Sequence, residues 1–75
     1  MTFFIHHNNK NLIIKFDAII NLIEIIVQNK SDVLLKTKLK VNSDFCIIPF
    51  DPPKGHYKIQ IIVEKRLFNR RVFVG

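Results

Sequence analysis

The sequence predicts an all-β domain, built as an antiparallel two-sheet sandwich of about seven short strands. Polar clusters interrupt the chain at short intervals, at residues 7–11, 29–32, 42–44 and 51–55. The runs between these clusters are rich in Ile, Val and Phe, which favour strands. Short apolar runs between closely spaced turns are typical of sandwiches and barrels.

The strands are predicted in chain order between the polar clusters, where each apolar run begins and ends. Their bounds are Thr2–His6, Leu12–Phe16, Asn21–Gln28, Val33–Val41, Phe45–Phe50, His56–Glu64 and Leu67–Val74. The first two are separated by the Asn-rich cluster at residues 7–11, which indicates a turn.

The third strand competes with a helix over residues 18–28. Asn21, Glu24 and Gln28 recur at spacings of three and four, and Asp17 is a suitable N-cap, as in an amphipathic helix. The apolar residues of this segment are nearly all β-branched, which lowers helix propensity and favours a strand that is apolar on both faces.

The fourth strand shows a clear period of two. Its alternating positions divide into an apolar set, Val33, Leu35, Leu39 and Val41 with Thr37, and a basic set, Lys36, Lys38 and Lys40. A strand places such lysines on one solvent face, whereas a helix would scatter them. In the fifth strand Pro49 cannot donate to a ladder, which predicts an edge position or the strand's end.

The last two strands form the closing hairpin. Gly55 suits the preceding turn, and the residues predicted to point inward are Tyr57, Ile59, Ile61 and Val63, which alternate with polar residues. A tight turn at Glu64-Lys65-Arg66 leads into the final strand.

Size and composition set the bounds on function. A chain of 75 residues makes one domain, 1–75, and its single cysteine, Cys46, rules out an intramolecular disulfide. The net charge of +6 suits nucleic acid, an acidic protein or an anionic membrane surface as partner, and it also aids solubility. No apolar run approaches the ~20 residues of a membrane span.

No catalytic, cofactor or metal site is predicted. His6 and His7 are adjacent, so on a strand they point to opposite faces and do not share one ion. Cys46 has no neighbouring histidine, and it is predicted to pack as a small apolar side chain. With only Gly55 and Gly75 there is no glycine-rich phosphate loop. We therefore expect a protein that is not an enzyme and carries no cofactor.

An interaction surface is predicted from charge and from unpartnered apolar residues. Ile23, Ile25 and Val27 occupy one face of their strand and Leu22 and Ile26 the other, and a sandwich this small covers only one of them. A homodimer or larger assembly through Leu22 to Val27, or through a neighbouring edge, would cover the other. The full candidate surface is Leu22, Ile26, Lys36, Lys38, Lys40, Arg66, Phe68, Arg70 and Arg71.

The basic residues also leave a nucleic-acid partner open. Lys65, Arg66, Arg70 and Arg71 surround Phe68, and cations beside an exposed aromatic are what an oligonucleotide-binding barrel uses. Lysines that solvate a face and protect an edge explain the other basic group equally well. No specific nucleic-acid motif accompanies the charge, so this partner ranks behind a protein.

The run Ile47 to Val74 resembles the end of small immunoglobulin-like sandwiches. Such modules occur as short secreted domains of unknown function and as carboxy-terminal sorting domains of the type IX secretion pathway. The shared pattern is Gly-x-Tyr-x-Ile-x-Ile, a tight turn, and a basic-basic-apolar-Phe-apolar strand, here at Gly55 to Ile61 and Arg70 to Val74. Leu12 to Phe16 and Ile23 to Ile25 fall where the family has its earlier strands.

The resemblance implies an immunoglobulin-like module outside the cytoplasm, provided that a signal peptide has been removed. The final turn departs from the family, which usually places Gly or Asn-Gly where this chain has Glu64-Lys65-Arg66. A large cargo domain, which a sorting domain normally follows, is also absent from this sequence. We therefore expect a non-catalytic binding or assembly module, with a single-stranded nucleic-acid-binding β-barrel or a secretion-sorting domain as alternatives.

Overall fold

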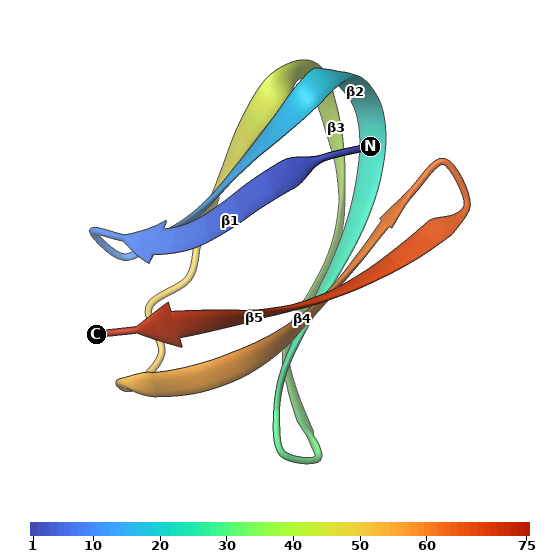
Figure 1. Ribbon diagram of the computed structural model, residues 1–75. Coiled ribbons are helices and arrows are strands. Elements are labelled where there is room, and N and C mark those ends of the chain that lie inside the picture. Colours follow the sequence, from blue (N-terminus) through green and yellow to red (C-terminus); the bar gives the residue numbers. More distant parts are fainter.

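The computed structural model describes all 75 residues, and it contains five strands and no helix (Figure 1). The strands are β1 (Phe3–Asn8), β2 (Asn11–Asn29), β3 (Asp32–Pro49), β4 (Gly55–Val63) and β5 (Arg66–Val74). Strands account for 81% of the residues. The all-β class predicted from the sequence is confirmed.

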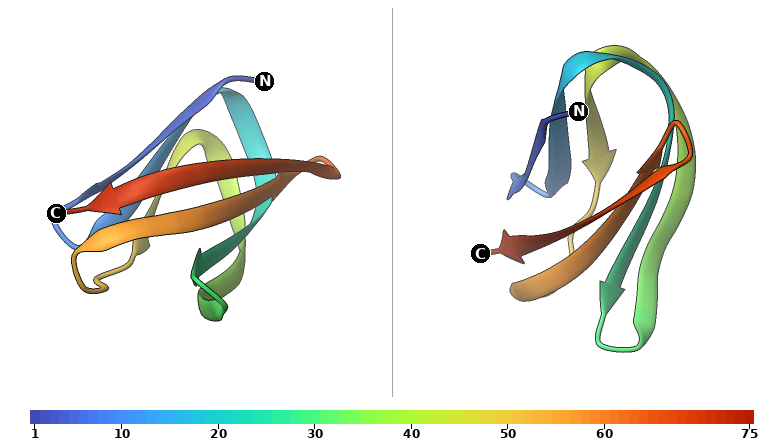
Figure 2. Two further views of the ribbon diagram at one scale, coloured as in Figure 1. Left: turned by 60° about the horizontal axis from the view of Figure 1, so that its bottom comes forward. Right: turned by 45° about the vertical axis from the view of Figure 1, so that its right-hand side comes forward.

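All neighbouring strands are antiparallel, and β2 is the centre of the sheet. One edge of β2 pairs with β3 along most of its length. The other edge pairs first with β1 and then with β4, to which β5 is added. Because β2 and β3 bend sharply, the sheet curls over itself into a half-barrel, and β1 comes close to β5 (Figures 1 and 2).

The structure has five strands where the sequence pattern predicts about seven. The second and third predicted strands are the two ends of β2, and the fourth and fifth are the two ends of β3. The breaks between these predicted strands lie at the bends: residues 16–19 of β2 have one β3 residue opposite them, and Asn42 in the polar cluster of β3 has a φ of 49°. Bulges of this kind bend a strand without ending it, so a polar break in the sequence is not always a turn.

The bend in β2 is held to β1 through Asp17. The Asp17 amide donates to the Thr2 carbonyl oxygen at 3.0 Å, and the Thr2 amide donates to the Asp17 carboxylate at 3.0 Å. Asp17, the N-cap of the helical alternative, therefore joins β2 to the residue that precedes β1. Residues 18–28 form strand throughout, which removes the helix.

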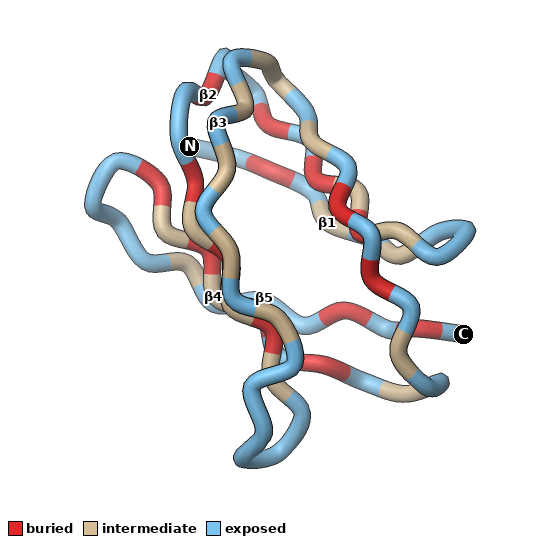
Figure 3. Tube along the Cα trace, turned by 180° about the vertical axis from the view of Figure 1, so that it is seen from behind, coloured by how far each residue is buried: buried red, intermediate tan, exposed pale blue.

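The predicted two-sheet sandwich is replaced by one continuous hydrogen-bonded sheet. The core lies between the two halves of the bent sheet, and Figure 3 shows the buried positions alternating along β2 and β4. It comprises sixteen residues: Phe3, Leu12, Ile14, Phe16, Ile20, Ile23, Ile25, Val27, Ile48, Phe50, Tyr57, Ile59, Ile61, Val63, Val72 and Val74. The inward orientation predicted for Tyr57, Ile59, Ile61 and Val63 is confirmed.

The connection from β3 to β4 closes one end of the core. β3 is an edge strand that ends at Pro49, as its missing amide hydrogen predicts. Phe50 then turns inward: its amide donates to the Lys10 carbonyl oxygen at 2.9 Å, and its carbonyl oxygen contacts the His7 ring. The Tyr57 hydroxyl donates to the carbonyl oxygen of Pro53.

No helix of the length and apolar character needed to span a membrane is present in the structure.

Candidate interaction surface

The outward side chains of β4, β5 and the adjoining halves of β2 and β3 form a surface that we call the convex face. Register places Leu22, Glu24 and Ile26 of β2 beside Lys40, Lys38 and Lys36 of β3. On the other side of β2, Glu24 lies beside Ile62 and Ile26 beside Gln60. The next row across, on β5, holds Leu67, Asn69 and Arg71.

Six of the nine candidate residues share this face. They are Leu22, Ile26, Lys36, Lys38, Lys40 and Arg71. The prediction that Lys36, Lys38 and Lys40 line one exposed face is confirmed, since all three are exposed. On the opposite side of β3, Leu35, Thr37, Leu39 and Val41 are half-buried, whereas Val33 is exposed because the pairing shifts beside it.

The centre of the convex face is mainly apolar, with one acidic residue, Glu24, between Leu22 and Ile26 and beside Ile62. Leu22 is 54% exposed and Leu67 is 55% exposed, while Ile26 and Ile62 are half-buried. A hollow of about 330 Å³ opens here, lined by apolar residues that include Leu22 and Ile62 and by charged residues of both signs, Glu24, Glu64, Lys38 and Lys65. The sequence pattern missed Ile62 and Leu67, although the run Ile61-Ile62-Val63 signals a strand that is apolar on both faces.

The rim of the convex face is cationic. The Lys38 ammonium lies 3.5 Å from the Glu24 carboxylate, and this is the single ion pair of the molecule. Lys58 and Arg71 are direct cross-strand neighbours, an arrangement that is unfavourable without an anion between them. The sequence pattern missed Lys58, which only the pairing of β4 with β5 brings beside Arg71.

Arg66, Phe68 and Arg70 point to the other side of β5, away from the convex face. The Arg70 guanidinium carbon lies 4.5 Å from the centre of the Phe3 ring and 5.8 Å from that of Phe68. The two rings meet edge to face, with centroids 5.3 Å apart. Phe68 is half-buried by these contacts, which join β5 to β1.

A second exposed apolar patch lies on the outer side of the other half-sheet. Pairing sets Lys15 of β2 between Phe4 of β1 and Phe45 of β3, with Ile47 one step along. Phe4 is 72% exposed and Phe45 is 49% exposed. The sequence analysis did not predict this patch, because it did not assign which side chains of the first and fifth predicted strands point outward.

The remaining candidates for chemistry are dispersed. No group of three or more His, Cys, Asp or Glu side chains is placed to hold a metal ion. His6 is exposed while His7 turns inward, so adjacent histidines do take opposite faces. Cys46 packs against the core, and burial raises the pKa of its thiol from 9.0 to about 11.

Comparisons with known proteins add no assignment, since no family model, no curated protein and no solved structure matches this chain.

Proposed function

We propose that this chain is a non-catalytic binding or assembly module that recognises a protein partner through its convex face. The observation that supports the proposal is a mainly apolar centre inside a cationic rim: Leu22, Ile26, Ile62 and Leu67 lie around Glu24, whose charge is paired with Lys38. Protein interfaces commonly combine an apolar centre with a polar rim, and an exposed apolar patch of this kind indicates a surface that another molecule covers.

The charge of the rim favours an acidic partner. Lys36, Lys40, Lys58 and Arg71 are exposed and have no acidic neighbour within salt-bridge distance. Complementary charge speeds encounter and disfavours partners of like charge. A partner with an apolar patch surrounded by carboxylates fits this face best.

Affinity capture with matched variants tests the proposal. The wild-type domain is immobilised beside a Leu22→Asp/Leu67→Asp variant and a control, Ile19→Asp/Ile47→Asp, which alters two exposed apolar residues outside the face. We expect wild type and control to retain the same acidic protein from an extract of the native cells, and the face variant to lose it. Equal retention by all three would contradict a role for the convex face.

The resemblance of Gly55 to Val74 to immunoglobulin-like modules supports a further part of the proposal, that the domain works outside the cytoplasm. The antiparallel all-β fold agrees with that resemblance only at the level of fold class. Fractionation of the native cells with an antibody against the domain tests the location. Recovery from the cytoplasm alone would end this part of the proposal.

Single-stranded nucleic acid remains the rival partner. Base stacking needs an exposed ring, and Phe68 is instead packed edge-on against Phe3 beside Arg70. We expect binding to a fluorescent oligothymidine to be weak and to vanish by ~0.2 M salt, as for purely ionic contacts. Tight binding that survives this salt and is lost in Phe68→Ala would favour the rival.

A further inference from the structure

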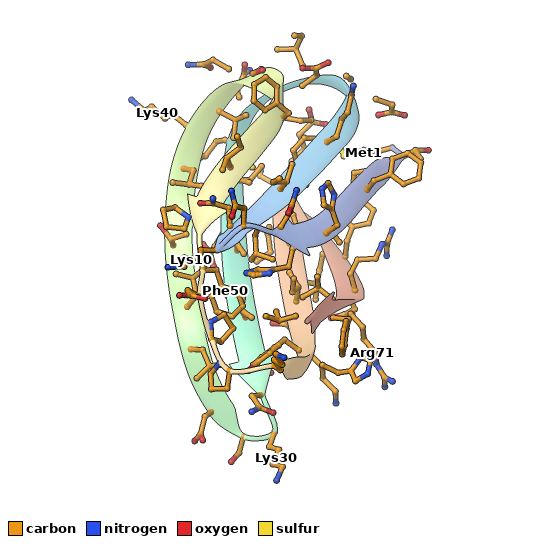
Figure 4. All side chains as sticks on the ribbon, turned by 90° about the vertical axis from the view of Figure 1, so that its left-hand side faces the viewer. Met1, Lys10, Lys30, Lys40, Phe50 and Arg71 are labelled. Carbon is orange, nitrogen blue, oxygen red and sulfur yellow. The ribbon has the colours of Figure 1, made fainter.

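The outer edge of β3 has no neighbour. β3 pairs only with β2, so its other edge has no strand beside it. Figure 3 shows that the first half of β3 carries no fully buried position, and Figure 4 shows Lys40 projecting from this side of the molecule. The backbone amides and carbonyls of a free edge form a ready template for another strand.

Side chains of different chemistry border the two sides of this edge. Lys36, Lys38 and Lys40 lie on the convex side, and no acidic residue occurs between Val33 and Ser43. On the concave side Leu35 and Leu39 are only half-buried, because no strand beyond β3 covers them. A strand added here would meet cations on one side and apolar groups on the other.

A second copy of this chain does not fit the edge. Antiparallel pairing of two β3 strands about Lys38 would set the Lys36 of each against the Lys40 of the other, and the two Lys38 residues against each other. Like charges directly opposite one another destabilise a strand pair. The lysines therefore oppose self-pairing, a common protection of edge strands.

We propose that the β3 edge from Val33 to Val41 binds an extended peptide in which acidic residues alternate with apolar ones. Strand addition supplies the backbone hydrogen bonds, and alternate side chains supply the specificity. Since strand side chains repeat every two residues, three acids at positions i, i+2 and i+4 face the three lysines. Glu24 already meets Lys38 in this way from the β2 side, at 3.5 Å.

The inference rests on the proposed function in taking an acidic protein as the partner. It adds the conformation and sequence pattern of the bound segment, and it places that segment on the edge of β3. The apolar centre of the convex face lies on β2, β4 and β5. The two attachments are therefore separable by mutation.

The first experiment measures fluorescence anisotropy with a labelled peptide that alternates three glutamates with valines. The wild-type domain is compared with Lys36→Glu/Lys40→Glu, which leaves the Glu24–Lys38 pair intact, and with Lys10→Glu/Lys54→Glu, which changes the net charge equally at two exposed residues outside both the β3 edge and the convex face. We expect the edge variant to bind roughly tenfold or more weakly and the control variant to bind nearly as tightly as wild type. Replacing the glutamates of the peptide with glutamines weakens binding similarly.

Amide hydrogen exchange locates the bound peptide. We expect added protection at amides between Val33 and Val41 and no added protection in β5. Binding that is indifferent to glutamine replacement, equal loss in both charge variants, or no binding of the glutamate peptide would overturn the proposal. Preference for oligothymidine or for anionic vesicles over the peptide would do the same.

The closing comparison separates failure of this inference from failure of the proposed function. The peptide is also titrated into Leu67→Asp, which alters the convex face on β5 and leaves β3 and its neighbours on β2 unchanged. Full binding by this variant supports attachment at the edge alone. If this variant loses binding and the β3 amides of the wild-type domain stay unprotected, attachment at the β3 edge is refuted, and the convex face remains as the binding surface.

Discussion

The position of each side chain in the curled sheet follows from its place in the two-residue repeat of its strand. Ile59 and Ile61 are fully buried because they face the inside of the bend, while Gln60 between them is half-exposed on the convex face. The same rule puts Arg70 against Phe3 and its neighbour Arg71 on the outside. Two adjacent arginines thus have different environments.

Ile59→Ala tests the core at this scale. Ile59 is 0% exposed, so its truncation removes buried methyl groups and leaves a cavity. We expect the free energy of unfolding to fall by ~2 to 5 kcal/mol, as measured by urea denaturation. The matched control is Ile19→Ala at a site that is 68% exposed, where we expect little change. Equal losses at the two sites would contradict the observed register.

Cys46 gives a prediction for pH. Burial raises the pKa of its thiol to about 11, because desolvation disfavours the thiolate. The thiolate is the reactive form, so at pH 8 we expect iodoacetamide to alkylate the folded chain at least ~10-fold more slowly than the urea-unfolded chain.

The same shift fixes how stability depends on pH. Above pH 9.0 the unfolded chain releases the thiol proton while the folded chain still holds it. The contribution of Cys46 to the free energy of unfolding is therefore fully present below pH 9.0 and is lost as the pH rises from 9.0 towards about 11. Alkylation at equal rates in the folded and unfolded chains would show that Cys46 is not desolvated.

At the scale of the element, the bends in β2 and β3 decide the fold. Each strand is long enough to serve both halves of the sheet, and the bulges at residues 16–19 and at Asn42 let it do so without breaking. The hairpins rely on left-handed residues that are not glycine: Asn9 and Lys10 before β2, and Glu64 and Lys65 before β5. Paired positive φ angles are typical of the type I′ turn.

The turn before β5 predicts a stabilising change. Glu64 and Lys65 have φ angles of 51° and 66°, a region that costs most L residues about 1 to 2 kcal/mol each. We expect Glu64→Asn/Lys65→Gly to raise the free energy of unfolding by about 1 kcal/mol, measured by urea denaturation. Arg66→Gly, at the first residue of β5, is the control and should destabilise the domain. A destabilised turn variant would contradict the type I′ geometry.

At the scale of the whole molecule, one curled sheet of 75 residues has a single enclosed side. Everything on the outer side stays uncovered, including Leu22 and Leu67 on the convex face and Phe4 and Phe45 on the other half-sheet. Both edges of β2 are already paired, so Leu22 to Val27 offers a partner its side chains and no backbone edge. Any homodimer through these residues is therefore a face-to-face contact.

Salt dependence distinguishes such a homodimer from binding of an acidic partner. Two convex faces in contact would bring like charges together around an apolar centre, and salt screens that repulsion. We expect sedimentation equilibrium at micromolar concentration to show a dimer fraction that rises between ~0.05 and ~0.5 M salt. We expect no dimer in the Leu22→Asp/Leu67→Asp variant. A strictly monomeric chain at both salt concentrations would contradict self-association through this face.

The sequence by itself determined the strand class, the inward register and the exposed lysine row. These depend on local chemistry: β-branched residues over 18–28 outweighed the helical spacing of Asn21, Glu24 and Gln28, and alternation fixed which side of β4 is buried. Pro49 correctly marked an edge strand because a missing amide hydrogen is a local property.

Only the tertiary structure decided the number of strands and the composition of the candidate surface. Whether a polar segment ends a strand or bends it depends on the partner strand, as at Asn42, which follows Lys40 and Val41 next to the Ile20–Ser43 pair where the bend in β2 ends. β4 pairs with β2 although the whole of β3 lies between them in the sequence. This long-range pairing, with that of β5 to β4, brings Ile62, Leu67 and Lys58 onto the convex face. Such pairings follow from how the whole core closes, and no local pattern encodes them.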